Sequence, residues 1–436
     1  MMKKISRRAF LQASAVGAAA LALTACGSST AASGAASAAS GAASSTASAA
    51  AKGAVTLKVW VPPYAGADAD YTDMDFWTDE FKSFESENNC TVEVSIFPWS
   101  GYMQKITTGM NASDGPDVIY IDTLYDLAAE GALLPLDSYF TQEEKDNYYY
   151  YDMGYVAGGQ YVLPIVVGDA TVLFCNMDIL KQAGYDAPPK NWDELMAYSK
   201  KIKEANPDVM PFEQPWGNTS GKSAVMTSFL PYFWEAGGTF LTSDGKPNLN
   251  SDAGLKTLNY LYSFMQEGIY DDTIVSVNDI SDEFRSGHAA MIMDGTGMSE
   301  SYGEAGINWD FSGLEGPGGK GYWISGDSMA VAANTKNPDL AVKAIKYMTS
   351  AAVMDVFHEK MYPAAPLTKD AKGLEDERFN DLYQNDTKYF HIWPAFSNAD
   401  SFYDILFKNI QSMYMGDLTA QQVIDNTMKE YDSSAT

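Results

Sequence analysis

The chain has 436 residues, of which 46% are hydrophobic and 20% charged, so it holds enough apolar material for a packed core and is not a wholly disordered protein. Its 57 acidic and 29 basic residues give a formal net charge of −28. A nucleic-acid binder needs clustered cations and is therefore not expected. The three histidines, His288, His358 and His391, have no metal-ligand spacing, and we expect neither a metal site nor a cofactor.

The first 25 residues have the features of an export signal. Four basic residues stand within the first eight positions, and an alanine-rich apolar run follows that is too short for a spanning helix. The segment Leu23-Thr24-Ala25-Cys26 resembles a bacterial lipobox, in which the signal is cleaved before the cysteine and the thiol is lipidated. Residues 6–12 (SRRAFLQ) also resemble a twin-arginine signal, so both this export route and the general one stay open.

Residues 26–53 form the second segment, which is the lipidated Cys26 followed by an Ala, Ser, Gly and Thr linker. Such a composition has nothing to bury and predicts a flexible tether. Residues 1–25 hold four basic and no acidic residues, so cleavage changes the net charge from −28 to −32 and disfavours docking on anionic lipid. We expect a protein anchored through Cys26 to the extracellular face of the cell membrane, with the lipid as its only membrane contact.

Strand and helix patterns alternate along the rest of the chain. Strand patterns occur over residues 55–61, 91–97 and 117–122, the last nearly all apolar, as in a buried parallel sheet. Helical patterns occur over residues 75–87, 191–205 and 251–266 and again from residue 338. This alternation predicts an α/β protein built of layered sheets and helices, and the length predicts two to three domains of about 100–200 residues.

Four groups of motifs follow one another in the order found in a known family. They are GPDVIY (115–120) with GALLPLD (131–137), YVLP (161–164) with LFCNMD (173–178) and PPKNWDEL (188–195), FRSGHAAM (284–291), and SMAVAA (328–333) with NPDLA (337–341). The ordered set resembles the extracellular solute-binding proteins of ABC importers, in the group of maltose- and oligosaccharide-binding proteins. Two positions depart from the family pattern: Cys175 stands where the family usually has Tyr, and residues 295–297 read Gly-Thr-Gly where it often has Gly-x-Trp.

The resemblance implies a two-lobed periplasmic-binding-protein-like fold of the class II type, whose lobes are joined at a hinge by crossing strands. It places the crossings near residues 168–171, 324–327 and 349–353. The N-terminal lobe would comprise residues 55–168 plus 327–350, and the C-terminal lobe residues 169–326 plus 351–436. It further implies hinge closure around a ligand in the cleft, delivery to ABC permease subunits, no catalysis, and a monomer.

The chain's 27 Tyr, 20 Phe and 9 Trp suit a sugar, because flat aromatic faces cover the apolar faces of a pyranose while polar side chains satisfy its hydroxyl rim. Two alternatives stay open. A binding protein for a polyamine, peptide or metal chelate would use carboxylates and cation–π contacts. A secreted glycoside hydrolase would also be acidic and aromatic-rich, since two carboxylates suffice for that chemistry.

The expected ligand-binding residues follow strand ends or lie where the family places cleft loops. They are Tyr64, Trp99, Asp122, Tyr125, Asp169, Trp216, Trp323, Trp393 and Tyr403. Several have a structural alternative: Asp122 could cap the helix that follows it, and Trp99 could pack without touching ligand. Trp192 and Trp234 are expected in the core.

Three further patterns were weighed and set aside. Residues 217–223 (GNTSGKS) have three residues between the glycines, where a phosphate loop needs four. The acidic run from Asp68 to Asp75 lacks the central Gly and terminal Glu of a calcium loop. Cys90 and Cys175 are expected to be two separate buried thiols rather than a disulfide.

Overall fold

The computed structural model describes residues 55–65, 69–99, 102–110, 112, 114–121, 125–217, 221–277, 279–374, 376–394 and 396–434, all of which belong to one structural unit, residues 43–436. The predicted export signal, the lipidation site Cys26, the linker and Asp122 lie outside the described residues, as does the side chain of Tyr125. Within the described ranges, no helix is both long enough and apolar enough to cross a membrane.

A five-stranded sheet forms around the first three predicted strands. Its spatial order is β2 (Cys90–Ile96), β1 (Val55–Val61), β3 (Val118–Ile121), β13 (Ser325–Val331) and β6 (Val162–Gly168). β1 runs parallel to β2 and β3, whereas β13 runs antiparallel to β3 and β6. The three N-terminal strands match the predicted ranges to within one residue at each end. Because they are parallel, their carboxyl ends meet at one edge, where open sheets bind ligands.

The helices in this part of the chain are α2 (Asp73–Asn88), α3 (Tyr102–Gly109), α4 (Tyr125–Ala129), α5 (Gln142–Asn147), α13 (Pro338–Met348) and α14 (Ala351–Lys360), with the short η1 (Asp137–Tyr139) and η2 (Tyr151–Gly154). Two of these helices, α2 and α5, begin with a capping box. At the start of α2, the Thr72 side chain accepts from the Asp75 backbone N–H, and the Asp75 carboxylate accepts from the Thr72 N–H. This capping box satisfies two backbone donors that the helix itself leaves unpaired.

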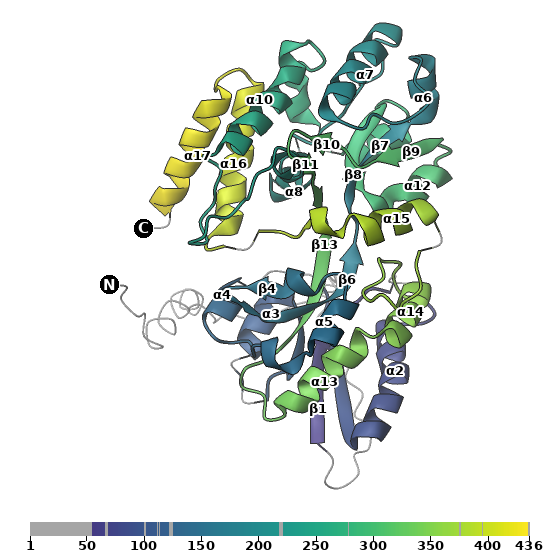
Figure 1. Ribbon diagram of the computed structural model, residues 1–436, viewed down its shortest axis with the longest axis vertical. Helices are drawn as coiled ribbons and strands as arrows, with labels where there is room; N and C mark the ends of the chain where they lie inside the picture. The colour runs from purple at the N-terminus through teal and green to yellow at the C-terminus, as the bar shows by residue number, and fades with distance from the viewer. Residues whose placement is uncertain are drawn as a thin grey trace, which may run out of the picture. The chain divides into compact units, whose positions relative to one another are not determined.

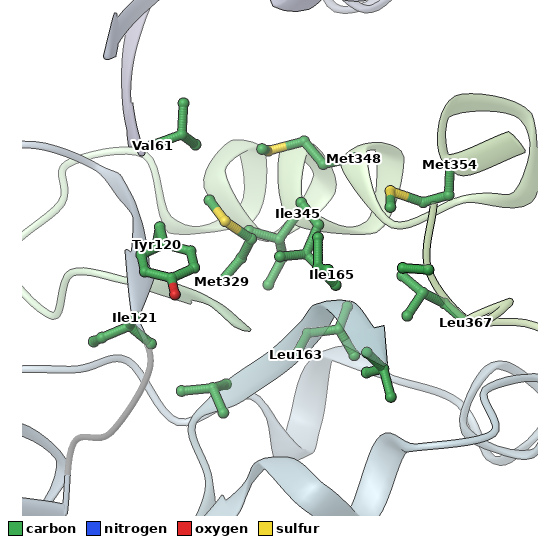
Figure 2. Close-up of a cluster of buried hydrophobic side chains, with 14 of the residues drawn as sticks. Val61, Tyr120, Ile121, Leu163, Ile165, Met329, Ile345, Met348, Met354 and Leu367 are labelled. Atoms are coloured by element: carbon green, nitrogen blue, oxygen red, sulfur yellow. The ribbon is translucent and has the colours of Figure 1, made fainter. Parts of the chain in front are cut away.

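Side chains from the sheet and from the covering helices meet in a first hydrophobic core. Figure 2 shows Ile345 and Met348 of α13 near Met329 of β13 and Ile165 of β6. All four are buried. Removing each such side chain from water stabilises the fold by about 1.5–3 kcal/mol, so this core fixes the sheet whose edge carries the candidate site.

A second, antiparallel sheet has the order β8 (Met291–Gly295), β7 (Thr171–Asn176) and β9 (Trp309–Ser312). The remaining helices are α6 (Met177–Gln182), α7 (Trp192–Ala205), α8 (Gly221–Ser228), α9 (Leu230–Glu235), α10 (Asp252–Gln266), α11 (Ile280–Arg285), α12 (Ser299–Glu304), α15 (Glu377–Asn385), α16 (Ala399–Tyr414) and α17 (Ala420–Ser434). The short elements are η3 (Asp272–Ser276), η4 (Thr296–Met298), η5 (Thr387–Tyr389) and the strand pairs β4 (Tyr155–Val156) with β5 (Gly159–Gln160), β10 (Glu315–Gly316) with β11 (Gly319–Lys320), and β12 (Tyr322–Trp323) with β14 (Phe390–His391). Figure 1 shows α10, α16 and α17 side by side, and their apolar faces form much of a second core.

The order of these elements bears on where the lobes divide. β6 of the first sheet ends at residue 168 and β7 of the second begins at residue 171, within the region predicted for the first crossing. Helix α14, which was expected in the C-terminal lobe, packs instead into the first core through Val353, Met354 and Phe357. The division of the chain remains a prediction, and we propose that its last boundary lies after α14 rather than at residue 350.

A buried carboxyl in the second core should make stability depend on pH. The Glu213 side chain is buried, and its burial, followed by the neighbouring Glu283 carboxylate, raises its pKa from 4.5 to about 8. The folded state therefore keeps a proton that the unfolded chain loses near pH 4.5, so the free energy of unfolding should fall as pH rises from about 4.5 to about 8. Glu213→Gln removes this dependence. At pH 9 the free energy of unfolding of the variant should exceed that of the parent by about 1–4 kcal/mol. At pH 5 the two values should be closer to each other.

Urea unfolding at pH 5, 7 and 9 measures this difference. Glu130→Gln is the matched control, since it removes the same charge at an exposed position. Parallel pH profiles for the parent and Glu213→Gln would contradict the assignment.

Candidate functional site

Six polar and aromatic side chains gather at the carboxyl edge of the five-stranded sheet. Tyr64 follows β1, Trp99 follows β2 and Tyr120 lies in β3. The other three come from distant parts of the chain, because β13, the end of β6 and the segment after α14 all reach this edge. We call the set the aromatic–carboxylate cluster; its members are Tyr64, Trp99, Tyr120, Asp169, Asp327 and Tyr362.

Tyr64 is fixed at both its backbone and its hydroxyl. Its backbone N–H donates to Asp73 Oδ1 at 2.7 Å, and the next N–H, of Ala65, donates to Asp73 Oδ2 at 3.0 Å. Its hydroxyl donates to Asp327 Oδ2 at 2.8 Å. The ring packs edge-on against Trp99, with centroids 5.6 Å apart. A side chain held at this many points is preorganised for recognition.

Asp327 of β13 links β3 and the segment after β1 through its two carboxylate oxygens. Oδ1 accepts from the hydroxyl of Tyr120 in β3 at 2.7 Å, while Oδ2 accepts from Tyr64. The residue stands where the register of β13 against β6 shifts, between Asp327 and Ser328. Such an irregularity re-aims a side chain out of the regular ladder. Burial, and then the charge of Asp327, raises the pKa of Tyr64 well above its ordinary value, so its phenol stays protonated and donates.

Two aromatic residues of the cluster expose their rings. The Trp99 side chain is 49% exposed and that of Tyr362 is 39% exposed. Both rings pack against that of Tyr64, whose centroid lies 5.6 Å from the Trp99 centroid and 6.0 Å from the Tyr362 centroid. The Trp99 indole N–H donates to the backbone oxygen of Pro63 at 2.8 Å, which fixes the ring while leaving it open to solvent. The cluster thus offers apolar surface beside polar acceptors.

Asp169 lies at the first predicted crossing, in a backbone conformation with φ of 56°, which non-glycine residues rarely adopt. Its Oδ1 accepts from the backbone N–H of Gly297 at 3.0 Å. A Cβ at Gly295 would lie 2.0 Å from the same oxygen, so the Gly-Thr-Gly segment makes room for this carboxylate. Burial, and then the charge of Asp294, raises the pKa of Asp169. Burial, and then the charges of Asp169 and Asp327, raises the pKa of Tyr362, so both carboxylates act electrostatically on its phenol.

Other predicted ligand residues lie away from this cluster. Trp216 is 0% exposed and packs in the second core against Phe407 and Tyr414. Tyr403 is also buried, and its hydroxyl donates to the backbone oxygen of Pro394 at 3.1 Å. Trp323 is half-buried in β12, beside the second core. In this structure the rings of both residues are covered by other side chains: that of Trp216 by Phe407 and Tyr414, and that of Tyr403 by Phe240, Trp393 and Phe396.

Trp393 lines a separate cavity of 1410 Å³. The described members of the aromatic–carboxylate cluster do not line this cavity, whose walls also include Tyr155, Trp234 and His391. The ring centroids of Trp393 and Tyr403 are 4.2 Å apart, and the ammonium of Lys222 lies 4.6 Å from the Trp393 ring centroid. Trp192 and Trp234 are buried, which confirms their prediction as core residues, although Trp234 also borders this cavity.

Sequence reasoning missed three members of the cluster. Tyr120 lies inside the motif that predicted β3, and Asp327 lies inside the region predicted for the second crossing. A carboxylate in a crossing strand was a usable signal for Asp327, because charges in strands are uncommon without a partner. Tyr362 follows α14 with no turn motif or periodic pattern to mark it.

The remaining sequence patterns have structural explanations. Cys90 and Cys175 are both buried and free, which confirms two separate thiols. Two carboxylates of the acidic run serve the backbone: Asp73 holds Tyr64 and Ala65, and Asp75 caps α2. Asp68, of the same run, and residues 218–220 of the glycine-rich segment lie outside the described residues. In the described ranges, no group of three His, Cys, Asp or Glu side chains is arranged to hold a metal ion.

Comparison with known proteins assigns the family. The family model of the bacterial extracellular solute-binding proteins matches residues 68–355. This chain belongs to that family. A binding protein of Brucella abortus (strain 2308) is 28% identical over 279 residues, which cover 61% of this chain and 66% of that protein, slightly less than two thirds of its length. The maltodextrin-binding protein of Bacillus subtilis (strain 168) is 26% identical over 318 residues, or 69% of this chain and 72% of the relative.

Solved structures show the same architecture. The cyclic alpha-maltosyl-1,6-maltose binding protein of Arthrobacter globiformis superposes with a TM-score of 0.71 at 17% identity, covering 86% of this chain and 97% of that one. The predicted two-lobed α/β fold is thereby confirmed, as is the predicted family. In this solute-binding protein, the carboxyl edge of the first sheet carries the cluster described above.

Proposed function

We propose that this solute-binding protein captures an oligosaccharide at the aromatic–carboxylate cluster and delivers it to the membrane permease of an ABC importer. The observation that carries the proposal is the pair of exposed rings, Trp99 and Tyr362, which both pack against a Tyr64 that Asp327 and Asp73 hold in place. A pyranose presents apolar C–H faces and a rim of hydroxyls, and this cluster offers a counterpart to each.

The relatives support the same ligand class. The Bacillus subtilis relative is named for maltodextrin and the Arthrobacter structure for a cyclic maltosyl sugar. A cation or peptide ligand would use the same carboxylates and rings, so the first experiment must separate these classes.

The family also supports a purely binding role without catalysis. We propose that the mature protein is a monomer anchored by a lipid on Cys26 at the extracellular face of the membrane. The lipobox and the linker support this arrangement, in which the tether lets the binding domain reach the permease. Asp122, Tyr125, Trp323 and Trp393 stay candidate ligand residues in addition to the members of the cluster.

A thermal-shift screen of the mature chain against neutral oligosaccharides, polyamines and peptides tests this function. Ligand at 100 times its Kd stabilises a protein by about 2.7 kcal/mol, which is a readily measured shift. We expect a shift with neutral oligosaccharide that is unchanged in high salt, because screening weakens only charged interactions. A shift with polyamine alone, abolished by salt, would replace the sugar by a cation.

Truncation of the two exposed rings should weaken binding with little effect on folding. Trp99→Ala and Tyr362→Ala each remove an apolar face, and we expect each to raise the Kd for the sugar about 10- to 100-fold, or about 1.4–2.8 kcal/mol. Tyr155→Ala is the control, because Tyr155 is 59% exposed and borders the separate cavity. Calorimetric titration would refute the assignment if the Tyr155 variant lost as much affinity as the Trp99 variant.

A further inference from the structure

A hydroxyl that does not belong to the aromatic–carboxylate cluster joins the two segments that hold Asp169. Tyr383 of α15 is 2% exposed, and its hydroxyl oxygen accepts from the backbone N–H of Ala170 at 2.9 Å. The same oxygen lies 2.6 Å from the hydroxyl oxygen of Thr296, and either group can donate in that hydrogen bond. Ala170 directly follows Asp169, and Thr296 precedes Gly297, whose N–H donates to the Asp169 carboxylate at 3.0 Å. One buried phenol therefore contacts both segments that fix this carboxylate.

A further hydrogen bond closes the arrangement. The backbone N–H of Thr296 donates to the backbone oxygen of Ala170 at 3.1 Å, so Ala170, Thr296 and Tyr383 form a ring of hydrogen bonds. Burial raises the pKa of Tyr383, so its phenol stays protonated. The φ of 56° at Asp169 is a conformation that persists only where the surrounding contacts impose it. The bond from Tyr383 to the Ala170 N–H fixes the peptide plane that follows Asp169, and the ring thereby supplies such contacts.

Tyr383 is itself held by contacts outside the cluster. Its backbone oxygen accepts from the hydroxyl of Tyr150 at 3.0 Å, and its ring packs edge-on against Phe390, with centroids 5.6 Å apart. Elsewhere on α15, the ring of Phe379 stacks on that of Phe311 in β9, with centroids 5.1 Å apart. These contacts anchor the Tyr383 hydroxyl independently of the Asp169 carboxylate.

From this we infer that Tyr383 is a positioning residue of the binding site, whose hydroxyl sets the place of the Asp169 carboxylate and thereby the affinity for the sugar. The inference rests on the proposed function and deepens it. In this structure the phenol is covered and its hydroxyl is bonded to protein groups, so it acts through Asp169 and not on the sugar itself. Hydrogen bonds weaken steeply when their geometry is lost, so a small displacement of the carboxylate weakens its bonds to sugar hydroxyls.

Removal of one oxygen atom tests the inference. Tyr383→Phe keeps the ring and leaves the Ala170 N–H without its acceptor, so the segment that follows Asp169 is free to shift. The probe is the neutral oligosaccharide that gives the largest shift in the thermal-shift screen, titrated into the mature chain well below the melting temperature of each variant. Its Kd should rise about tenfold. Tyr260→Phe is the matched control, because its hydroxyl donates to the backbone oxygen of Trp192 within the second core, and its Kd should stay within twofold of the parent value.

The partner hydroxyl allows a test by rescue. Thr296→Val removes this hydroxyl at a similar side-chain volume and should also raise the Kd about tenfold. Thr296→Ser keeps the hydroxyl, so its Kd should stay within threefold of the parent value. When Tyr383→Phe and Thr296→Val are combined, the two losses of affinity should not add, because both changes remove the same hydrogen bond.

A double-mutant cycle separates positioning from general support of the fold. Asp169→Gly removes the carboxylate, and glycine adopts the φ of 56° at this position without strain. In this background Tyr383→Phe should change the Kd less than threefold. In the Trp99→Ala background, where the carboxylate is still present, Tyr383→Phe should keep its tenfold effect.

Each outcome decides the inference. An unchanged Kd in Tyr383→Phe, together with a raised Kd in Trp99→Ala, would overturn it and leave sugar capture intact. A tenfold effect of Tyr383→Phe that persists without the Asp169 carboxylate would also overturn it, as would equal losses in Thr296→Ser and Thr296→Val. If no neutral oligosaccharide shifts the melting temperature of the parent protein, the proposed function fails, and this inference fails with it.

Discussion

Replacing Phe357 with alanine is expected to lower the free energy of unfolding by about 3–5 kcal/mol. Phe357 of α14 is 0% exposed, and its ring packs edge-on against Phe76 at 5.4 Å and Tyr64 at 5.2 Å. Truncation leaves a cavity between α14 and α2 that a rigid sheet cannot fill. Because the same ring supports Tyr64, sugar affinity should fall together with stability.

Chemical unfolding followed by tryptophan fluorescence measures the effect. Phe357→Leu keeps most of the volume and should cost less than about 1.5 kcal/mol. Tyr155→Ala, at an exposed position, should change stability by no more than about 0.5 kcal/mol. A loss below 1.5 kcal/mol in Phe357→Ala would show that α14 packs less tightly on the first core than this structure indicates.

The strands and helices were predictable because their apolar patterns are local. Residues 55–61 alternate along the chain, and residues 191–205 carry a cap and an apolar stripe within one helix. The placement of α14 was not predictable in this way. Its apolar residues are consistent with packing on either core, and only the tertiary contact of Phe357 with α2 decides between them.

The candidate site, too, was predictable from local sequence signals but not from its tertiary contacts. Tyr64 and Trp99 were predicted because each follows a strand end, and Asp169 because the family resemblance places a sugar-binding carboxylate at the first crossing; the structure brings these three together. The bonds that orient them were not predictable, since Asp327 and Tyr120 stand 207 positions apart in the chain. For Trp216, the family resemblance predicted a ring that stacks on ligand from a loop, and in this structure the ring packs against Phe407 and Tyr414.

Gly295→Ala should reduce ligand affinity more than its small volume suggests. The backbone of Gly295 has φ of −71°, which alanine adopts without strain. The added methyl would lie 2.0 Å from Asp169 Oδ1, so the carboxylate must leave its position and its bond to Gly297. We expect sugar affinity to fall at least tenfold, with a loss of stability of about 1–3 kcal/mol from overpacking.

A double-mutant cycle isolates the cause of the loss of stability. Asp169→Gly removes the carboxylate, and glycine accepts the φ of 56° at this position. If the clash with Asp169 is what Gly295→Ala introduces, the methyl should cost less than about 0.5 kcal/mol in the Asp169→Gly background, and the two single losses should not add. Additive losses would place the damage in β8 itself. In that case, room for the Asp169 carboxylate would not explain why residues 295–297 read Gly-Thr-Gly where the family often has Gly-x-Trp.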